Sequence, residues 1–477
     1  MARIDEYEQQ DALGLAAWVR AGEVSPCDLL EAAVARVEER NAALNAVVIR
    51  AFEEGRKAID AGLPEGPFRG VPWLLKDLHA AWKGVRLTSG SRFFADNVSD
   101  YDTELTARYK RAGLVLFGRT ASPEFGGTST TESILHGATR NPWKPTHSAG
   151  GSSGGAAAAV AAGIVPAAHA TDGGGSIRIP ASCCGLFGMK PTRARVPSGP
   201  KLGEGWSGMS VQHAVSRSVR DSAALLDAVS GPAIGDPYDA PPPARPFLAE
   251  VGAHPGRLRI AVQVSAFNGA EVDPDCVAAA RDAADLCRSL GHDVAEAELL
   301  VDRELLARSS GTIIGASLRA TLLERAAELG RDVTADDVEP LNWLIAEQIK
   351  QTTAADYAAA LRGIHRLGRE VSRFLERYDV LVTPTMATPP LPLGRLALTR
   401  SDFPGLVTDL SRTIGFTQLF NASGHPAMSV PLYWNSAGLP IGVQFAGRFG
   451  DEATLFRLAA QLESARPWFL RRPASSN

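Results

Sequence analysis

The chain has 477 residues, of which 45% are hydrophobic, so it can bury a large core. Its 49 Lys and Arg and 53 Asp and Glu leave a formal net charge of −4, which argues against electrostatic binding to nucleic acid or to a membrane surface. The five cysteines include no CxxC pair, which favours reduced thiols over a disulfide framework or a zinc site. The polar, acidic start is unlike a signal peptide, and we expect a cytoplasmic protein.

Helix and strand patterns alternate along the chain, which favours an α/β architecture. The first strong helix is predicted to begin at Ser25, an N-cap residue followed by Pro26. A buried strand over 70–75 ends at Lys76. A polar helix over 103–113 then leads into a second strand over 114–118.

The C-terminal half repeats this alternation. A helix is predicted after Asp273, and Gly291 lies beyond its end. Strands are expected over 378–384 and 439–447, followed by a helix over 451–463. The proline-rich segment at about 231–250 is interpreted as a surface excursion within one domain of residues 1–477, and helices at about 300–375 are expected to cover a substrate pocket.

Two clusters of glycine and serine flank an alanine-rich run, at 148–155 and 171–176. Such clusters are usually linkers, but a helix-forming run follows the first one directly. We therefore expect a tight turn that opens a helix near Ser153. The apolar segment over 163–170 is predicted to be a strand. The three glycines after it allow backbone N–H groups to converge on one point, which is the geometry of an oxyanion hole.

Three other chemistries compete for the first cluster. A phosphate-binding loop needs a lysine after Gly155, and a dinucleotide fingerprint needs a strand directly before Gly150, where we expect a loop. A nucleophile elbow is matched literally by residues 151–155. It also needs a hydrophobic strand upstream, against which Pro142 and Pro145 argue, and a later histidine such as His425. A non-amidase serine hydrolase of the α/β type therefore stays an alternative.

The ordered motifs GVPWLLKD, GGSSGG and TDGGGSIRIPASCCGLFGMKPT resemble the amidase signature family, as do FNASGHPAMSVPL and GLPIGVQFAG near the end. Within that family, GATRNPW, IPAS and ARPW are most similar to bacterial amidases of the 6-aminohexanoate-cyclic-dimer hydrolase type. The resemblance implies a single amidase domain with its signature core at about 65–230. It also implies an amidase signature fold, in which a large mixed β-sheet is flanked by α-helices on both faces.

The resemblance further implies a Ser–cisSer–Lys triad. Lys76 is the base, Ser152 is the serine that follows a cis peptide bond and relays the proton, and Ser176 is the nucleophile. The family's oxyanion hole uses backbone N–H groups of the segment that corresponds here to Gly173, Gly174, Gly175 and Ser176. Gly173 departs from the family pattern, because relatives usually carry a bulkier residue there. We therefore expect a less rigid loop.

Other residues are predicted to support this site. Asp172 and Arg178 flank the nucleophile and are expected to hold its loop through polar contacts, and Ser153 is expected to hydrogen-bond within the turn. The resemblance places Gly126, Gly127 and Thr128 along the substrate pocket. Three histidines near the motifs are interpreted as structural: His79, His147 and His169.

The expected activity is hydrolysis of a small-molecule amide through a serine acyl-enzyme, without metal or organic cofactor. Serine needs a base to become nucleophilic, and Lys76 follows an apolar strand whose burial lowers a lysine pKa. Esters, anilides and carbamates share this route, and the family allows a homodimer. One alternative is the amidase subunit of a tRNA-dependent amidotransferase. A binding protein that has lost catalysis is disfavoured, because all three triad residues are retained.

Overall fold

The protein is described by a computed structural model over residues 4–474. Its longer strands are β1 (Val47–Arg50), β2 (Pro72–Lys76), β3 (Val115–Thr120), β8 (Ala167–Asp172), β9 (Phe187–Lys190), β10 (Val211–Ser216), β11 (Arg259–Val262), β12 (Asp293–Glu296), β13 (Val380–Pro384), β14 (Ala427–Trp434) and β15 (Pro440–Gly447). Two short hairpins pair β4 (Glu132–Ser133) with β5 (Gly137–Ala138), and β6 (Arg140–Asn141) with β7 (Lys144–Ser148).

The α-helices are α1 (Ala12–Arg20), α2 (Pro26–Leu44), α3 (Phe52–Asp60), α4 (Glu104–Arg111), α5 (Gly154–Ala161), α6 (Arg178–Cys184), α7 (Val219–Val229), α8 (Pro274–Ser289), α9 (Arg303–Leu329), α10 (Pro340–Gln348), α11 (Ala354–Arg377), α12 (Phe403–Ile414), α13 (Gln418–Ser423) and α14 (Glu452–Ala465). No helix within residues 4–474 combines the length and apolar character needed to cross a membrane.

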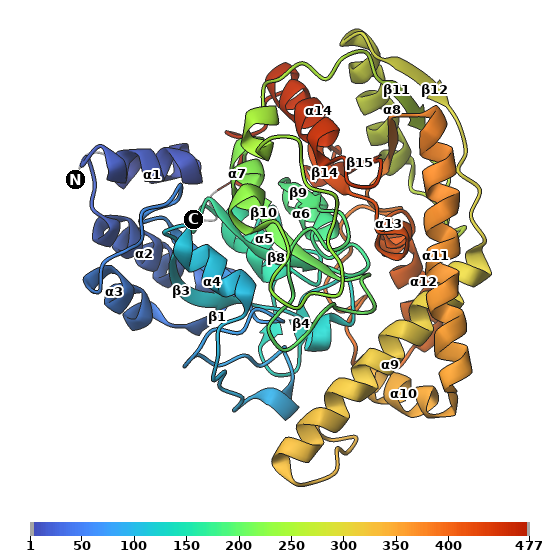
Figure 1. Ribbon diagram of the computed structural model, residues 1–477, viewed down its shortest axis with the longest axis horizontal. Helices are drawn as coiled ribbons and strands as arrows, with labels where there is room; N and C mark the ends of the chain where they lie inside the picture. The colour runs from blue at the N-terminus through green and yellow to red at the C-terminus, as the bar shows by residue number, and fades with distance from the viewer. Residues whose placement is uncertain (1–3, 475–477) are drawn as a thin grey trace.

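The strands form a sheet of eight and a sheet of three that meet side by side. The larger sheet has the order β12-β11-β13-β15-β14-β9-β10-β8, and the smaller one β1-β3-β2. Strand β2 lies beside β8, the edge of the larger sheet. Figure 1 shows β8 near the centre of the molecule, with β1 and β3 of the smaller sheet on the side of the N-terminal helices. The backbone N–H of Lys76 donates to His169 Nδ1 at 3.1 Å, so a side chain of β8 bonds to the backbone of β2 across this junction.

Both faces of the larger sheet are buried. Strand β11 pairs in parallel with β12 and β13, whereas β13, β15 and β14 pair antiparallel, so the sheet is mixed. Along β13, Val380 and Val382 belong to the main apolar cluster, and Leu381 belongs to a second cluster on the other face. The predicted mixed sheet is confirmed.

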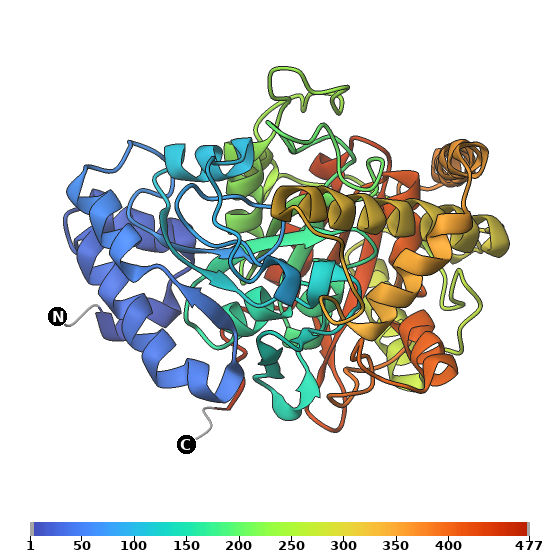
Figure 2. The same ribbon diagram turned by 90° about the horizontal axis from the view of Figure 1, so that it is seen from below.

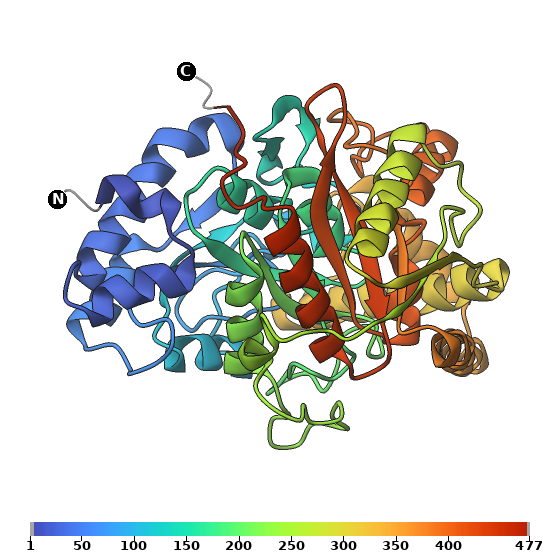
Figure 3. The same cartoon turned by 90° about the horizontal axis from the view of Figure 1, so that it is seen from above.

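Helices cover the two sides of this sheet. Figure 3 shows α7, α8 and α14 over one side. The long helices α9 and α11 pack on each other, and Figure 2 shows α9 crossing the opposite side. We call α9, α10 and α11 the cap helices. The segment 231–246 contains no helix or strand.

Local signals predicted several elements correctly. Helix α2 begins after Ser25, whose hydroxyl accepts from Asp28 N–H, and α8 begins after the cap Asp273. Two predictions are wrong. Strand β8 begins at Ala167 rather than at Gly163 and continues to Asp172. The segment before Gly150 is not a loop, because it contains the hairpin of β6 and β7, whose largely exposed position tolerates Pro145.

Candidate active site

The amine of Lys76 lies at the centre of the candidate site. Lys76 is the last residue of β2, whose five residues are all buried, and its own side chain is fully buried. Its Nζ lies 2.7 Å from Ser152 Oγ and 2.8 Å from Thr171 Oγ1. Burial lowers the pKa of Lys76 well below 10.5, and the charge of Asp172 opposes this effect only in part. The site therefore favours a neutral amine that can accept a proton.

Ser152 connects this amine to the turn before α5. The Gly151–Ser152 peptide bond is cis, and Ser152 is buried. Gly126, at φ +70°, lies against the Ser152 hydroxyl, because a Cβ at position 126 would lie 3.1 Å from Ser152 Oγ. The space beside this hydroxyl is thus kept clear of a side chain.

Ser176 lies on the turn between β8 and α6. The turn follows directly after Thr171 and Asp172, so Ser176 is five residues beyond the threonine that contacts Lys76. Ser176 is half-buried, and within residues 4–474 no hydrogen bond engages its hydroxyl. Its side chain is therefore available to a substrate.

A buried ion pair holds the turn that carries Ser176. Arg178 donates to Asp172 through Nε at 2.9 Å and Nη2 at 2.8 Å, and both side chains are fully buried. The Asp172 carboxylate also accepts from the N–H groups of Gly175 at 2.8 Å and Ile177 at 3.2 Å. Burial is the largest single influence on Asp172 and raises its pKa, but the charge and hydrogen bonds of Arg178, the charge of Lys190 and the hydrogen bond from Asn421 together outweigh it and lower this pKa to about 2. These contacts match the holding role predicted for Asp172 and Arg178.

The same contacts reduce the number of N–H groups that can serve as oxyanion-hole donors. The N–H of Gly175 is engaged by Asp172, so it does not point at a substrate. In the described part of the chain, no protein acceptor engages the N–H groups of Gly173, Gly174 or Ser176. The candidate donors for a substrate oxyanion are therefore these three groups, and Gly175 is removed from the prediction.

Ser153 supports the site in a different way from the one expected. Its hydroxyl donates to the carbonyl of Thr171 and accepts from the N–H of Thr171, both at 3.2 Å. It thus bonds to β8 rather than within its own turn. This pair of bonds fixes the strand end at Thr171, whose side chain contacts Lys76.

The predicted substrate residues lie between this site and the cap. Gly126 contacts Ser152, and a Cβ on Gly127 would lie 2.9 Å from Asn342 Oδ1 of α10. The Thr128 hydroxyl donates to the carbonyl of Leu396 at 2.9 Å, so a protein acceptor already occupies it. A role of these residues in substrate binding stays a prediction.

Two of the three histidines near the motifs, His169 and His147, have hydrogen-bond partners outside the serine clusters. His169 accepts from Lys76 N–H, and the imidazole of His147 lies 2.9 Å from Thr146 Oγ1. Burial, followed by the charge of Lys76, lowers the pKa of His79 to about 4. His425 Nε2 lies 3.1 Å from Ser372 Oγ, and none of its hydrogen bonds in residues 4–474 reaches the serine clusters. His425 therefore does not serve a nucleophile elbow at 151–155.

Three residues that support the candidate site were not identified from the sequence: Thr171, Asn421 and Thr417. Thr171 immediately precedes Asp172 in the motif, so its contact with Lys76 was within reach of motif reasoning. Asn421 donates to the Asp172 carboxylate at 2.8 Å, and Thr417 donates to the Gly174 carbonyl at 2.6 Å. Both lie more than 240 positions from the turn. Asn421 falls within the motif FNASGHPAMSVPL, which could have marked it, whereas Thr417 lies outside every motif.

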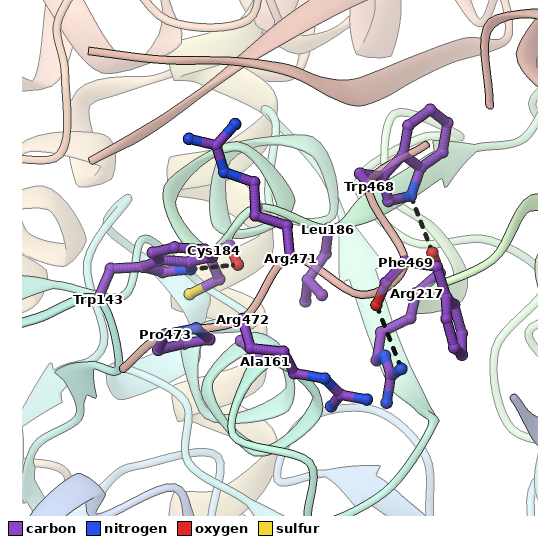
Figure 4. A pocket seen from close by; sticks show the side chains of 11 residues that line it. Trp143, Ala161, Cys184, Leu186, Arg217, Trp468, Phe469, Arg471, Arg472 and Pro473 are labelled. Carbon is purple, nitrogen blue, oxygen red and sulfur yellow. Dashed lines mark hydrogen bonds between the residues drawn. The ribbon is translucent and has the colours of Figure 1, made fainter. Parts of the chain in front are cut away.

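Other cavities lie apart from this site. One of about 440 Å³ is lined by Trp82, Lys83 and Asp102 among others, and one of about 420 Å³ by His254, Pro255 and Arg457 among others. Figure 4 shows a cavity beneath the C-terminal segment, lined by Trp143, Cys184 and Trp468 among others. Its volume is about 10 Å³, which is enough for about one water molecule, and no predicted site residue lines it. In residues 4–474, no group of three or more His, Cys, Asp or Glu side chains is arranged to hold a metal ion.

The fold is a mixed sheet with helices on both sides, and the buried contact between Lys76 and Ser152 lies at the junction of the two sheets. Comparison with known proteins identifies the family. The amidase family model matches residues 28–456, and the chain belongs to this family of amide hydrolases. The elbow-type α/β hydrolase is therefore excluded, and the predicted family and fold are confirmed.

Three relatives place the chain within the family. It is 41% identical over 491 aligned positions to the 6-aminohexanoate-cyclic-dimer hydrolase of Paenarthrobacter ureafaciens, covering 100% of this chain and 98% of the relative. A solved structure of 6-aminohexanoate cyclic dimer hydrolase superposes with a TM-score of 0.93 at 40% identity, covering 98% and 99% of the two chains. A bacterial aryl acylamidase superposes with a TM-score of 0.89 at 28% identity, covering 96% of each chain.

Proposed function

We propose that this amidase cleaves its substrate through an acyl-enzyme on Ser176, with Ser152 as proton relay and Lys76 as base. The contact of 2.7 Å between the fully buried Lys76 Nζ and Ser152 Oγ carries the proposal. A lysine acts as a base only when neutral, and burial without a directly bonded carboxylate produces that state.

The reaction begins when Ser176 Oγ attacks the amide carbonyl. Its proton passes to Ser152, whose own proton passes to the Lys76 amine. The negative charge on the carbonyl oxygen is stabilised by the N–H groups of Gly173, Gly174 and Ser176. Collapse of this intermediate breaks the C–N bond, and the proton returns through Ser152 to the leaving amine. Water then attacks the acyl-enzyme by the same relay and releases the acid.

Two features of the protein prepare this relay before substrate binds. Thr171 holds Lys76 Nζ at 2.8 Å, so the amine needs no rearrangement to face Ser152. The Asp172 carboxylate fixes the turn through the N–H groups of Gly175 and Ile177, which orients the neighbouring donors. Preorganised donors stabilise a developing charge without a cost of reorientation in the transition state.

We infer that the substrate is a small amide of the cyclic-diamide class. The likeness to hydrolases named for the cyclic dimer of 6-aminohexanoate extends over 100% of this chain, which supports that class. Linear amides, anilides, esters and carbamates also present a carbonyl to Ser176, and we expect the enzyme to hydrolyse them with a lower kcat/KM than cyclic diamides.

The test is a rate comparison across these substrates. The wild-type chain should hydrolyse cyclic diamides, and Ser176→Ala and Lys76→Ala should each lower kcat by at least about 10³-fold while circular dichroism stays unchanged. Ser289→Ala, at the exposed end of α8, is the matched control and should keep the wild-type rate. A Ser176→Ala variant with normal turnover would overturn the proposal. Glutamine hydrolysis that exceeds all other activities would point to an amidotransferase subunit.

A further inference from the structure

Trp206 has an unusual backbone conformation close to the nucleophile turn. Its φ is +49° and that of the next residue, Ser207, is +52°. Left-handed backbone is uncommon for residues other than glycine and is an outlier for a bulky aromatic residue. Such conformations persist where the surrounding structure fixes them, and they concentrate at functional sites.

Several contacts hold this turn in place. Ser207 Oγ lies 2.7 Å from the hydroxyl of Tyr357 on the cap helix α11. The carbonyl of Met209 accepts from Asn421 Nδ2 at 3.0 Å, and the same nitrogen donates to the carbonyl and the carboxylate of Asp172. The turn around Trp206 is thus bonded both to the cap and to the residue that fixes the nucleophile turn.

The Trp206 ring occupies the space that a side chain at position 173 would need. A Cβ built on Gly173 would lie 2.6 Å from Trp206 Cε3 and still closer to Cζ3. The expectation that Gly173 leaves a looser turn is therefore wrong, because an indole replaces the missing side chain. In contrast, a Cβ on Gly174 would meet no atom within 4 Å, so the turn is open beside that residue.

These two glycines define the surroundings of the substrate carbonyl. If the proposed function holds, the carbonyl oxygen lies at the N–H groups of 173, 174 and 176. The acyl group attached to it then projects into the open space at Gly174, next to the indole. Trp206 is half-buried and packs against the second apolar cluster, which includes Met209, Phe416 and Phe420. The wall that it presents is apolar and rigid.

We propose that Trp206 is a specificity-determining residue that forms the wall of the acyl pocket and selects unbranched methylene chains over acyl groups branched near the carbonyl. The inference rests on the proposed function, since it places the carbonyl at the nucleophile turn. Gly173 and Trp206 act as a complementary pair, because the indole fits only where residue 173 has no Cβ.

The first test measures kcat/KM for two p-nitroanilides, one of hexanoic acid and one of 2-methylhexanoic acid. Wild type should prefer the unbranched acid, and Trp206→Ala should reduce that preference by about tenfold or more, since a pocket wall discriminates methyl groups on this scale. Trp206→Phe, which keeps an aromatic wall, should retain most of the preference. A residue that only stabilises the fold would lower both rates equally, and an unchanged ratio in Trp206→Ala would overturn the proposal.

The second test uses the glycine pair as a double-mutant cycle. Gly173→Ala alone should lower kcat/KM by about 10²-fold, because the indole and the nucleophile turn are displaced. Adding Trp206→Ala should recover most of this loss. Gly311→Ala, on the exposed face of α9, is the matched control: its methyl group meets no atom within 4 Å, so it should keep the wild-type rate and Trp206→Ala should have the same effect with or without it. If Gly173→Ala lowers kcat/KM by the same factor in the wild-type and Trp206→Ala backgrounds, Gly173 and Trp206 are not a complementary pair.

A binding measurement separates this inference from the proposed mechanism. In a Ser176→Ala background, a non-hydrolysed cyclic diamide should change the tryptophan fluorescence, and Trp206→Phe should remove most of that change. If Ser176→Ala still turns over substrate, the proposed mechanism fails, whereas the fluorescence change and the acyl preference report on Trp206 alone. Binding of the diamide without any contribution from Trp206 would overturn the inference.

Discussion

Replacing Arg178 by methionine removes the cation that pairs with Asp172 beneath the nucleophile turn. Arg178 makes hydrogen bonds to Asp172 and also to Thr417, Gln444 and Asn421, and it is fully buried. Removing one partner of a buried pair leaves an uncompensated charge, which costs about 3–5 kcal/mol of folding free energy. The turn that carries Ser176 also loses its support, so we expect kcat/KM to fall by about 10²-fold.

The pKa of Asp172 gives a second, independent value for the free energy by which the ionised carboxylate stabilises the fold. The folded protein lowers it from 3.8 to about 2. At about 1.4 kcal/mol for each unit of that difference, the ionised carboxylate contributes roughly 2–3 kcal/mol of stability. Because the folded pKa is depressed, this contribution is present above pH 3.8 and is lost as the pH falls toward 2.

Urea unfolding at several pH values measures both effects. The denaturation midpoint of Arg178→Met should lie well below that of wild type at pH 7, and the gap should narrow as the pH falls from about 4 to 2. Arg259→Met is the matched control, because its ion pair with Asp379 is half-exposed and should contribute less than about 1 kcal/mol. An Arg178→Met variant no less stable than Arg259→Met would refute the reasoning.

Three further substitutions test the site and its cap. Lys76→Met should abolish turnover and raise the denaturation midpoint at pH 7, because the folded chain no longer desolvates an amine whose pKa is depressed. That gain should shrink as the pH rises through 10.5, above which the unfolded lysine is also neutral, and a gain independent of pH would contradict this. Thr171→Val should lower kcat by about tenfold, while Thr171→Ser keeps the hydroxyl on Lys76 and the rate; equal rates in both variants would exclude the positioning role. Glu339 precedes α10, and burial raises its pKa to about 7, so wild type loses stability as the pH rises from 4.5 through 7. Glu339→Gln should therefore have a higher urea midpoint than wild type at pH 8 and the same midpoint below pH 4.5. Equal midpoints at both pH values would contradict the raised pKa of Glu339.

The sequence predicted those parts of the site that short-range patterns encode. Lys76 follows a strand whose apolar residues are uninterrupted, and Ser153 opens a helix after a run of glycine and serine, so both positions follow from local rules. The Lys76–Ser152 contact joins residues 76 positions apart, and only the resemblance to a family brought them together before the structure did.

The remaining features depend on packing that no local pattern records. The Trp206 ring packs on Gly173, which lies 33 positions earlier in the chain. The left-handed backbone at Trp206 has no sequence signal, because residue 206 is not a glycine. The loss of Gly175 as an oxyanion donor is different, because Asp172 lies only three residues before it. An Asp side chain that accepts from an N–H a few residues later is a common local motif, so this correction was available from the sequence.

The central claim is that Ser176 carries the acyl group during turnover, and trapping that intermediate tests it most directly. The enzyme is mixed with an activated p-nitrophenyl ester of hexanoic acid, quenched in acid, digested and analysed by mass spectrometry. We predict a hexanoyl group on the peptide that contains Ser176, with no acylation in Ser176→Ala. Acylation of the peptide that contains Ser152 and Ser153 instead, or equal acylation in Ser176→Ala, would contradict the account.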